Sequence, residues 1–319
     1  MPIGIATKFT KRTKLTNSCY SGMKTIAIAG GTGLIGSKLV TLWKSQGHEV
    51  RILSRGKTNV SQGIYHWDPI KRELDQEALI GVHVLVNLTG SGIADKRWSD
   101  ARIQELYDSR VKTTEFLLTQ AQDSTTLEHY LSASGAVCYG FDQPNREHEE
   151  TDPFGTDVLS DITKKWEQAA QLFASKCSVT CVRIPVVLAT DGGALPTMMG
   201  PVKFGFGSAL GSGKQGVPWV HIDDLVALFD FCVQQKLSGI YNANAGNTTN
   251  KELMRTIARV LRKPFWAPAV PGFALKLILG KMASVVLDGL KTSNKLIRSK
   301  GFEFQFTDLE MALAQLLKK

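Results

Sequence analysis

Short apolar runs alternate with amphipathic segments over the first part of the chain. Residues 82–88 form an almost continuous apolar run, which is typical of a strand buried on both faces. Residues 160–175 instead repeat their apolar side chains at helical spacing. Because strands and helices alternate, the pattern predicts a parallel sheet with helices on both faces. The expected strands are 25–29, 49–53, 64–67, 82–88, 129–132 and 179–187, and the main expected helices end near 46 or span 99–122 and 160–175.

The pattern changes after about residue 188. Residues 189–215 are rich in glycine and irregular, and shorter helical and strand-like pieces follow them. We expect a smaller α+β region that covers the carboxyl edge of the sheet, where open α/β sheets bind their ligands. The pieces expected in it are 223–234, 240–242, 250–262, 273–285 and 307–317.

A glycine-rich turn joins the first expected strand to the first expected helix, and residues 25–36 read TIAIAGGTGLIG. Its glycines allow a tight turn, a close approach of the backbone to a diphosphate, and packing of the helix on the sheet. The amide groups and the positive dipole end of that helix attract phosphate. The turn therefore predicts a dinucleotide site, against the alternative of a purely structural turn. The residues expected to form it are Gly30, Gly31, Thr32, Gly33, Leu34, Ile35 and Gly36.

The end of the second strand indicates which dinucleotide is bound. A site for NAD places an acid about 20 residues after the glycines, but this chain has Ser54 and Arg55 there. A guanidinium can hold a 2′-phosphate with two hydrogen bonds, so we expect NADP(H) rather than NAD. Asp68 follows the third strand and could accept a hydrogen bond from the adenine amino group; the alternative is an aspartate that stabilises a turn before proline.

These features together predict an α/β fold, a Rossmann-type doubly wound parallel sheet with a smaller C-terminal α+β region. We expect a disordered basic leader at 1–22 and a Rossmann NADP-binding domain at 23–187. Residues 188–319 are expected to form a C-terminal substrate-binding region packed on the same sheet.

Composition narrows the choice of partners. The chain has 319 residues and a net charge of +9, but residues 1–22 contribute four cations and no acid, so the remainder carries +5. We expect this excess to serve a phosphate-bearing ligand and not nucleic acid. For the first 22 residues, a targeting peptide or translation from a start upstream of the natural one are the alternatives to a disordered leader.

Metal, disulfide and membrane chemistry find no support in the sequence. The five cysteines are odd in number and contain no C-x-x-C pair, which predicts free thiols in a reducing compartment and no metal site. The most apolar stretch, 266–290, is interrupted by prolines and charges. We expect it to be an amphipathic helix and not a membrane span.

Short motifs are spread from about Met23 to the C-terminus, and they are specific as a set: GGTGLIG at 30–36, LSR at 53–55, WDP at 67–69, NLTG at 87–90, DKRW at 95–98, DSRV at 108–111, SAS at 132–134, YG at 139–140, WE at 166–167, DGGA at 191–194, LGSG at 210–213, HIDDL at 221–225 and GF at 301–302. The set resembles the extended short-chain dehydrogenase/reductase superfamily, and more narrowly its atypical branch of epimerase family proteins, often labelled sugar-nucleotide epimerases. The resemblance implies hydride transfer, with net reduction or epimerisation, on a phosphate-bearing or nucleotide-linked small molecule.

The chain departs from that superfamily where its members carry their acid/base residues. The family pattern has a tyrosine and a lysine four residues apart on one helix, and counting back from Trp166 places them at Leu159 and Thr163. Lys164 and Lys165 are one and two residues off register, a rotation of about 100–200° around the helix. The family's asparagine corresponds here to Arg110.

The resemblance also implies further site residues. Ser134 matches the family's serine, and Tyr139 is the remaining phenol next to it, so these two are the candidate catalytic residues; the alternative for Tyr139 is a packing role. His221 with Asp223 suggests a dyad, against the simpler reading of a helix start that includes Asp224. The further cofactor-binding residues expected at the strand ends are Leu88, Thr89, Gly90, Ala133 and Pro185.

Two functions therefore compete. The first is an NADP(H)-dependent epimerase or reductase that works without the usual tyrosine and lysine. The second is a non-catalytic NADP(H)-binding sensor. We expect a small-molecule substrate, no nucleic-acid or membrane partner, and a cytoplasmic location, while a homodimer and organellar targeting by the leader remain open.

Overall fold

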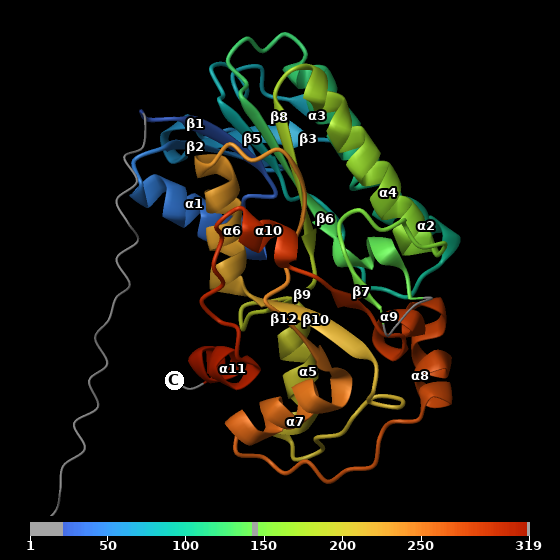
Figure 1. Cartoon of the computed structure of the whole chain (residues 1–319). Coiled ribbons are helices and arrows are strands. Elements are labelled where there is room, and N and C mark those ends of the chain that lie inside the picture. The colour runs from blue at the N-terminus through green and yellow to red at the C-terminus, as the bar shows by residue number, and fades with distance from the viewer. Residues whose placement is uncertain (1–21, 142–145, 318–319) are drawn as a thin grey trace, which may run out of the picture.

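The computed structural model describes residues 22–141 and 146–317 of the chain. The expected disorder of the basic leader concerns residues that lie, apart from Gly22, outside the described part. Figure 1 shows the large sheet with its helices in the upper half of the view and a second group of strands and helices in the lower half.

The large sheet has eight strands in the order β11-β8-β6-β5-β1-β2-β3-β4. Every pair in it is parallel except β3 with the short β4. The chain thus starts at the centre and winds outward in both directions, which confirms the predicted doubly wound fold. Its strands are β1 Thr25–Ala29, β2 Glu49–Ser54, β3 Ile64–Asp68, β4 Glu73–Leu74, β5 Val84–Asn87, β6 His129–Gly135, β8 Ser178–Ile184 and β11 Gly239–Asn242.

Helices cover both faces of this sheet because the central strands are apolar on both sides. In β1, Ile26 and Ile28 belong to one apolar cluster, and Ala27 and Ala29 belong to another. In Figure 1 one face carries α1 and α6, and the other carries α2, α3 and α4. These helices are α1 Leu34–Ser45, α2 Asp100–Asp108, α3 Val111–Ala121, α4 Val158–Gln171 and α6 Ile222–Gln234.

Two expected elements are broken in the structure. The single helix expected at 99–122 divides into α2 and α3 at Ser109, whose hydroxyl donates to Leu106 O at 3.1 Å and competes with the helical ladder. The strand expected at 179–187 ends at Ile184. Pro185 has no amide hydrogen to continue the ladder, and the chain re-forms after it as β9 in a different sheet.

The remainder of the chain builds a second sheet and also completes the first. Strand β11 is the edge of the large sheet beside β8, so residues after 188 contribute to both sheets. The stretch expected to be irregular contains α5. The small sheet consists of β9 Val186–Leu188, β10 Gly216–His221 and β12 Gly246–Thr249, and around it lie α5 Ala194–Lys203, α7 Asn250–Val260 and α11 Leu309–Leu317. The other elements are the pair β7 Glu147–His148 and β13 Lys291–Thr292, with α8 Gly272–Leu279, α9 Ser284–Leu287 and α10 Lys295–Ser299.

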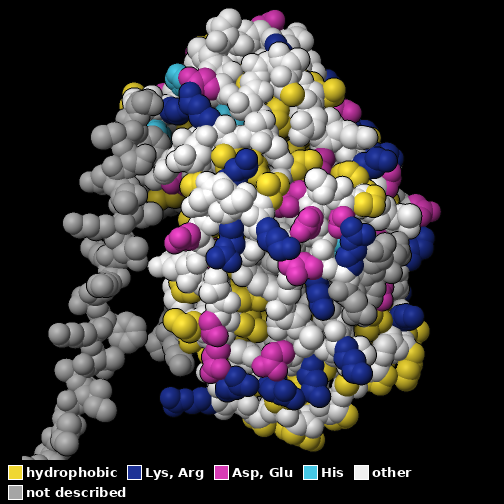
Figure 2. Space-filling view, viewed as in Figure 1, with side chains coloured by type: hydrophobic (Ala, Val, Ile, Leu, Met, Phe, Trp, Pro, Cys, Tyr) yellow, Lys and Arg dark blue, Asp and Glu magenta, His cyan; other side chains and the backbone are white. Residues whose placement is uncertain are grey.

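The distribution of surface charge and the length of the helices concern two of the partners considered above, nucleic acid and membrane. On the face shown in Figure 2, basic and acidic side chains are interspersed over the middle of the molecule and do not form one uniform basic field. No helix among the described residues is both long and apolar enough to span a bilayer.

The contact between α1 and the glycine turn generates a stability prediction. A Cβ added to Gly36 would lie 2.3 Å from Gly30 O and 2.7 Å from Gly31 Cα, so α1 has no room for any side chain there. We expect Gly36→Ala to lower the free energy of unfolding by about 1–3 kcal/mol or more, because backbone must shift. Urea denaturation measures this, with exposed Ser37→Ala as the control. Equal stability of the two variants would contradict the close contact.

Candidate cofactor site

The glycine turn presents the start of α1 to the carboxyl edge of the sheet. Gly30 has a φ of +83°, which favours glycine, and Gly33 N donates to Gly30 O at 3.0 Å to close the turn. Gly33 is the N-cap of α1; no side chain caps this helix, and its first turn contains no acid. The first amides of a helix have no partner within it, and the helix dipole favours an anion at this end. The turn therefore fits the diphosphate of a dinucleotide.

The end of β2 lies directly beside this turn. Ala29 pairs with Leu53 in the parallel register, and β2 ends one residue later at Ser54, so Arg55 leaves the sheet on the same edge as the glycines. Arg55 is exposed, and Ser54 Oγ accepts a hydrogen bond from Gly56 N at 3.3 Å. A guanidinium at this position is placed to meet a phosphate on the adenosine ribose.

Asp68 is engaged in a turn at the end of β3. Its Oδ1 accepts hydrogen bonds from Ile70 N at 3.0 Å and from Lys71 N at 3.2 Å. This is the arrangement expected for an aspartate that stabilises a turn before proline. Its contact with adenine stays a prediction.

A buried asparagine shapes the loop after β5. Asn87 Oδ1 accepts from Thr89 N at 3.1 Å and from Thr89 Oγ1 at 2.5 Å, while its Nδ2 donates to Thr114 and Tyr130. Leu88 N donates to Ala29 O at 2.9 Å. Asn87 is fully buried and holds Thr89, while the backbone bond of Leu88 to Ala29 keeps the loop beside the glycine turn.

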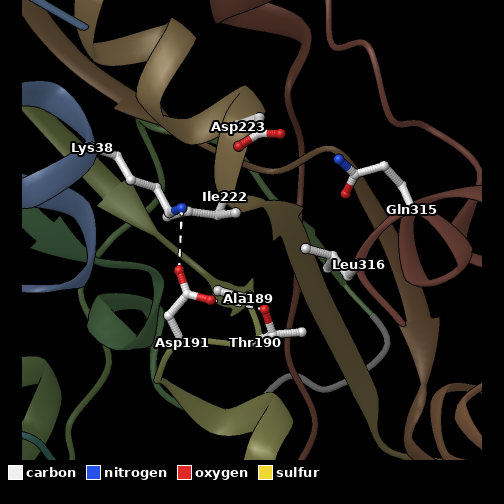
Figure 3. A pocket seen from close by; sticks show the side chains of 8 residues that line it. All are labelled: Lys38, Ala189, Thr190, Asp191, Ile222, Asp223, Gln315 and Leu316. Atoms are coloured by element: carbon white, nitrogen blue, oxygen red, sulfur yellow. Dashed lines mark hydrogen bonds and ion pairs between the residues drawn. The ribbon is translucent and has the colours of Figure 1, made fainter. Parts of the chain in front are cut away.

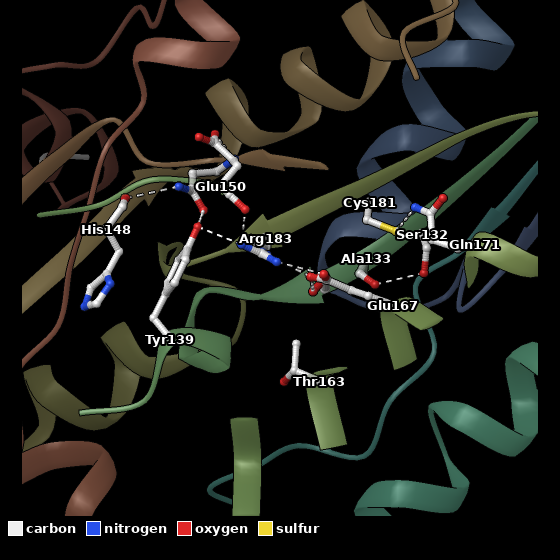
Figure 4. Close-up of polar contacts among 12 residues, drawn as sticks. Ser132, Ala133, Tyr139, His148, Glu150, Thr163, Glu167, Gln171, Cys181 and Arg183 are labelled. Carbon is white, nitrogen blue, oxygen red and sulfur yellow. Dashed lines mark hydrogen bonds and ion pairs between the residues drawn. The ribbon is translucent and has the colours of Figure 1, made fainter. Parts of the chain in front are cut away.

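Ser134 lies at the end of β6 and is joined to a buried ion pair. Its Oγ donates to Glu167 Oε1 at 2.5 Å. Arg183 holds both oxygens of the same carboxylate, with Nε to Oε1 and Nη2 to Oε2 at 2.9 Å each. Figure 4 shows the Arg183 side chain between Tyr139 and Glu167. A bidentate pair of this kind satisfies both buried charges and fixes α4 against β8.

Tyr139 belongs to the same buried network. Its hydroxyl donates to Asn242 Oδ1 at 2.8 Å and accepts from Arg183 Nη1 at 2.9 Å, and its ring stacks on His148 at 4.9 Å. Burial raises the pKa of Tyr139, which makes its proton harder to release. The structure thus gives both candidate catalytic hydroxyls protein partners, and their catalytic role stays a prediction.

The two positions of α4 at which the superfamily's tyrosine and lysine are expected lie on the face of the helix that packs inward. Leu159 and Thr163 are buried, and Thr163 Oγ1 donates to Leu159 O at 2.7 Å. Leu159 packs in an apolar cluster that includes Trp98 and reaches Val285 of α9. Lys164 and Lys165 are exposed, as their register predicted.

The remaining candidates have local roles in the fold. His221 Nδ1 accepts from Asp223 N at 3.1 Å, its Nε2 is 3.0 Å from Gln315 Oε1, and its ring stacks on Phe306. Burial lowers the pKa of His221 and favours the neutral ring. Asp224 accepts two backbone amides, from Gln305 and Phe306. The helix-start interpretation of this segment is therefore the one that the contacts support.

Two further predicted residues lie at the same edge. Ala133 is buried in β6, where Ser132 Oγ donates to its carbonyl at 2.9 Å, and Pro185 is partly buried between β8 and β9. Burial also raises the pKa of the Cys138 thiol, so it lacks the character of a reactive cysteine. Among the described residues, no group of three His, Cys, Asp or Glu side chains could hold a metal ion.

A cavity of about 260 Å³ lies between Lys38 of α1, the chain after β9 and the start of α6. Lys38 faces Asp191 across it with 3.3 Å between Nζ and Oδ2, and Figure 3 shows Gln315 and Leu316 approaching from the opposite wall. None of the predicted cofactor-binding residues lines this cavity, although Asp223 of the candidate dyad does, so we do not assign it to the cofactor. Its lining residues are Lys38, Ala189, Thr190, Asp191, Ile222, Asp223, Gln315 and Leu316.

Sequence reasoning missed three members of the buried network: Glu167, Arg183 and Asn242. A signal for Arg183 was present, because a charge inside the apolar run 179–187 needs a buried partner. Which carboxylate supplies it depends on how α4 packs on β8, and no local pattern records that.

Comparison with known proteins agrees with the geometry. An uncapped helix after a glycine turn, at the centre of a doubly wound sheet, defines a dinucleotide-binding protein of the short-chain dehydrogenase/reductase type. Residues 26–243 match the model of the NAD dependent epimerase/dehydratase family, and residues 270–316 match a domain of unknown function, DUF1731. The chain belongs to the NAD dependent epimerase/dehydratase family.

Relatives match over almost their whole length. Mouse epimerase family protein SDR39U1 is 31% identical over 304 residues, which are 92% of this chain and 99% of the mouse protein. The chloroplastic SDR39U1 homologue of Arabidopsis thaliana is 32% identical and covers 95% of this chain and 90% of its own. The crystal structure of human SDR39U1 with NADPH has a TM-score of 0.84 at 29% identity, over 92% of this chain and 99% of the human one.

The buried ion pair generates the prediction of this section. Glu167→Gln leaves the Arg183 guanidinium buried without its charge partner, so we expect the free energy of unfolding to fall by about 3–5 kcal/mol. The control is Asp161→Asn on the same helix, which breaks an exposed pair with Lys165 and should cost less than about 1 kcal/mol. Urea denaturation of both variants checks this, and equal losses would contradict the role of the buried pair.

Proposed function

We propose that this chain binds NADP(H), with the diphosphate at the start of α1 and the 2′-phosphate at Arg55. The observation that carries the proposal is the uncapped, acid-free first turn of α1 behind a turn that only glycine can form. The absence of an acid at the end of β2 supports NADP(H) over NAD. The NADPH in the human structure, from a relative of similar length and fold, supports the same cofactor.

Arg55 should decide between the two nucleotides. We expect Arg55→Ala to raise the Kd of NADPH about 10–100-fold, because a charge-assisted phosphate contact is lost, and to leave the Kd of NADH nearly unchanged. Lys57→Ala, which removes another exposed cation from the same loop, is the matched control. Isothermal titration calorimetry measures the six constants, for both nucleotides on the wild type and on the two variants. An equal loss for both nucleotides would show that Arg55 does not read the 2′-phosphate.

Gly33 should be required for either nucleotide. Its φ of −78° and ψ of −179° suit any residue, so Gly33→Val is expected to fold, while its side chain would project where the diphosphate must approach. We expect binding of NADPH and NADH to be lost, with Ser45→Ala at the far end of α1 as the control. Retained affinity in a folded Gly33→Val variant would overturn the assignment of the turn.

We further propose that the bound cofactor serves hydride transfer on a nucleotide-linked small molecule, without the tyrosine and lysine pair. When bound, NADPH supplies a hydride, and a carbonyl substrate then also needs a proton. A nucleoside-diphosphate sugar epimerase from Corynebacterium glutamicum supports this substrate class, with 26% identity and a TM-score of 0.76 over 93% of this chain and 58% of that one. Ser134 or Tyr139 could deliver the proton only after giving up its bond to Glu167 or Asn242.

The engagement of both hydroxyls favours a second candidate, a non-catalytic NADP(H) sensor. Leu159 and Thr163, buried where the family carries its acid/base pair, support it as well. A sensor must bind NADPH and NADP⁺ with different affinities, because a ligand with equal affinity for two states shifts neither.

One pair of measurements separates the two functions. Absorbance at the NADPH band is followed with a panel of nucleotide sugars and simple carbonyl compounds, and the same mixtures are analysed for epimerised sugars, because epimerisation consumes no net NADPH. The Kd values of NADPH and NADP⁺ are determined on the same protein. Oxidation of NADPH that disappears in Gly33→Val supports the enzyme. Absence of turnover together with a tenfold or larger difference between the two Kd values supports the sensor.

The proposal also covers the ligand class, the cellular location and the oligomeric state of the protein. We expect a small-molecule ligand, and we expect function in the cytoplasm, although one plant relative is named chloroplastic. A homodimer stays open, and the oligomeric state in solution is measured directly by light scattering.

A further inference from the structure

Arg110 lies where α2 ends and α3 begins, beneath the loop that follows β5. Its Nη2 donates to Ser91 O at 2.9 Å, and its Nη1 donates to Leu106 O at 3.1 Å. The guanidinium carbon lies 5.4 Å from the centre of the Trp166 ring on α4. The cation thus bridges the β5 loop and α4, two elements that border the carboxyl edge of the sheet.

Among the described residues, Arg110 has no acidic partner. Its contacts are two carbonyls, the Ser109 hydroxyl at 3.4 Å and an aromatic ring. Two buried arginines of the same chain do have carboxylates: Arg102 contacts Glu105, and Arg183 contacts Glu167. Burial, together with the charge of Arg102, lowers the pKa of Arg110 to about 10. A charge removed from water without a counter-charge is costly, and an arriving anion offsets that cost.

The backbone of Gly90 packs directly against the Arg110 guanidinium, so this position has no room for a side chain. Gly90 is exposed, and a Cβ added to it would lie 3.0 Å from Cζ, 3.1 Å from Nη2 and 3.3 Å from Nε of Arg110. The three hydrogen bonds of Arg110 leave Nε and one hydrogen of Nη2 without an acceptor. These two groups are neighbours on the guanidinium plane, and such a pair of donors matches the oxygens of a carboxylate or a phosphate.

We propose that the edge of Arg110 that carries Nε and Nη2, next to the exposed Gly90, forms an anion subsite, which takes a carboxylate or phosphate group of the small molecule that binds beside the cofactor. The inference rests on the proposed function for the position of the cofactor next to it. Phosphates of the cofactor itself are the other source of the same chemistry, and the experiment below separates the two sources. Arg110 would position its ligand by charge and hydrogen bonds and would take no part in proton transfer.

The experiment measures the Kd of inorganic phosphate on the full chain, saturated with NADPH, at constant ionic strength. We expect Arg110→Gln to raise this Kd at least about tenfold, since a charge-assisted contact is lost. Arg110→Lys keeps the charge without the paired donors, so its Kd for phosphate should lie between those of the wild type and Arg110→Gln. Gly90→Ala keeps Arg110 but adds a Cβ against its guanidinium, so it should also raise the Kd of phosphate. Arg298→Gln removes an exposed cation from α10 and is the matched control, with a Kd like that of the wild type.

The outcomes decide the proposal in each case. Wild-type phosphate affinity in Arg110→Gln, or absence of phosphate binding to the NADPH-saturated wild type, refutes the subsite. If phosphate binds only without NADPH, and Arg110→Gln weakens NADPH itself, the anion belongs to the cofactor and a separate subsite is wrong. Failure of the proposed function is recognised separately, because NADPH then does not bind the wild-type protein. In that case the Kd of phosphate is measured for the same variants without NADPH.

Discussion

The whole candidate site depends on one close approach of backbone to backbone. Gly36, in the first turn of α1, lies so near Gly30 that a single added carbon would overlap the Gly30 carbonyl. This contact places the start of α1 against the end of β1 and leaves the first amides of the helix facing the carboxyl edge of the sheet. Parallel pairing brings the ends of β2, β5 and β6 to the same edge, so Arg55, Thr89 and Ala133 lie on the edge of the sheet that carries the glycine turn.

A second constraint decides which polar groups are free at this edge. The buried pair of Glu167 and Arg183 engages the hydroxyls of Ser134 and Tyr139, so the residues most suited to acid/base work also stabilise the packing of α4 on β8. Arg110 is the opposite case, a partly buried cation with no acidic partner in the described part of the chain. Such a division, with neutral groups satisfied and one cation unsatisfied, favours binding of an anion at this edge over proton transfer there.

The sequence predicted what local pattern can encode. Strand and helix order, the glycine turn and the outward direction of Lys164 and Lys165 follow from periodicity and spacing, and the structure has them. The sequence did not predict that β11, from a distant part of the chain, forms one edge of the large sheet. It also did not predict that the chain enters a second sheet after Pro185. The partners of Ser134 and Tyr139 were also missed, because Glu167 and Asn242 approach them only through tertiary packing.

Phosphorus NMR of bound NADPH tests the central claim most directly, since it resolves the diphosphate from the 2′-phosphate in one spectrum. The account predicts that addition of the protein shifts or broadens both sets of signals, the first through the amides of α1 and the second through Arg55. Unchanged signals from both groups, in a folded sample with the protein in excess of NADPH, would contradict it.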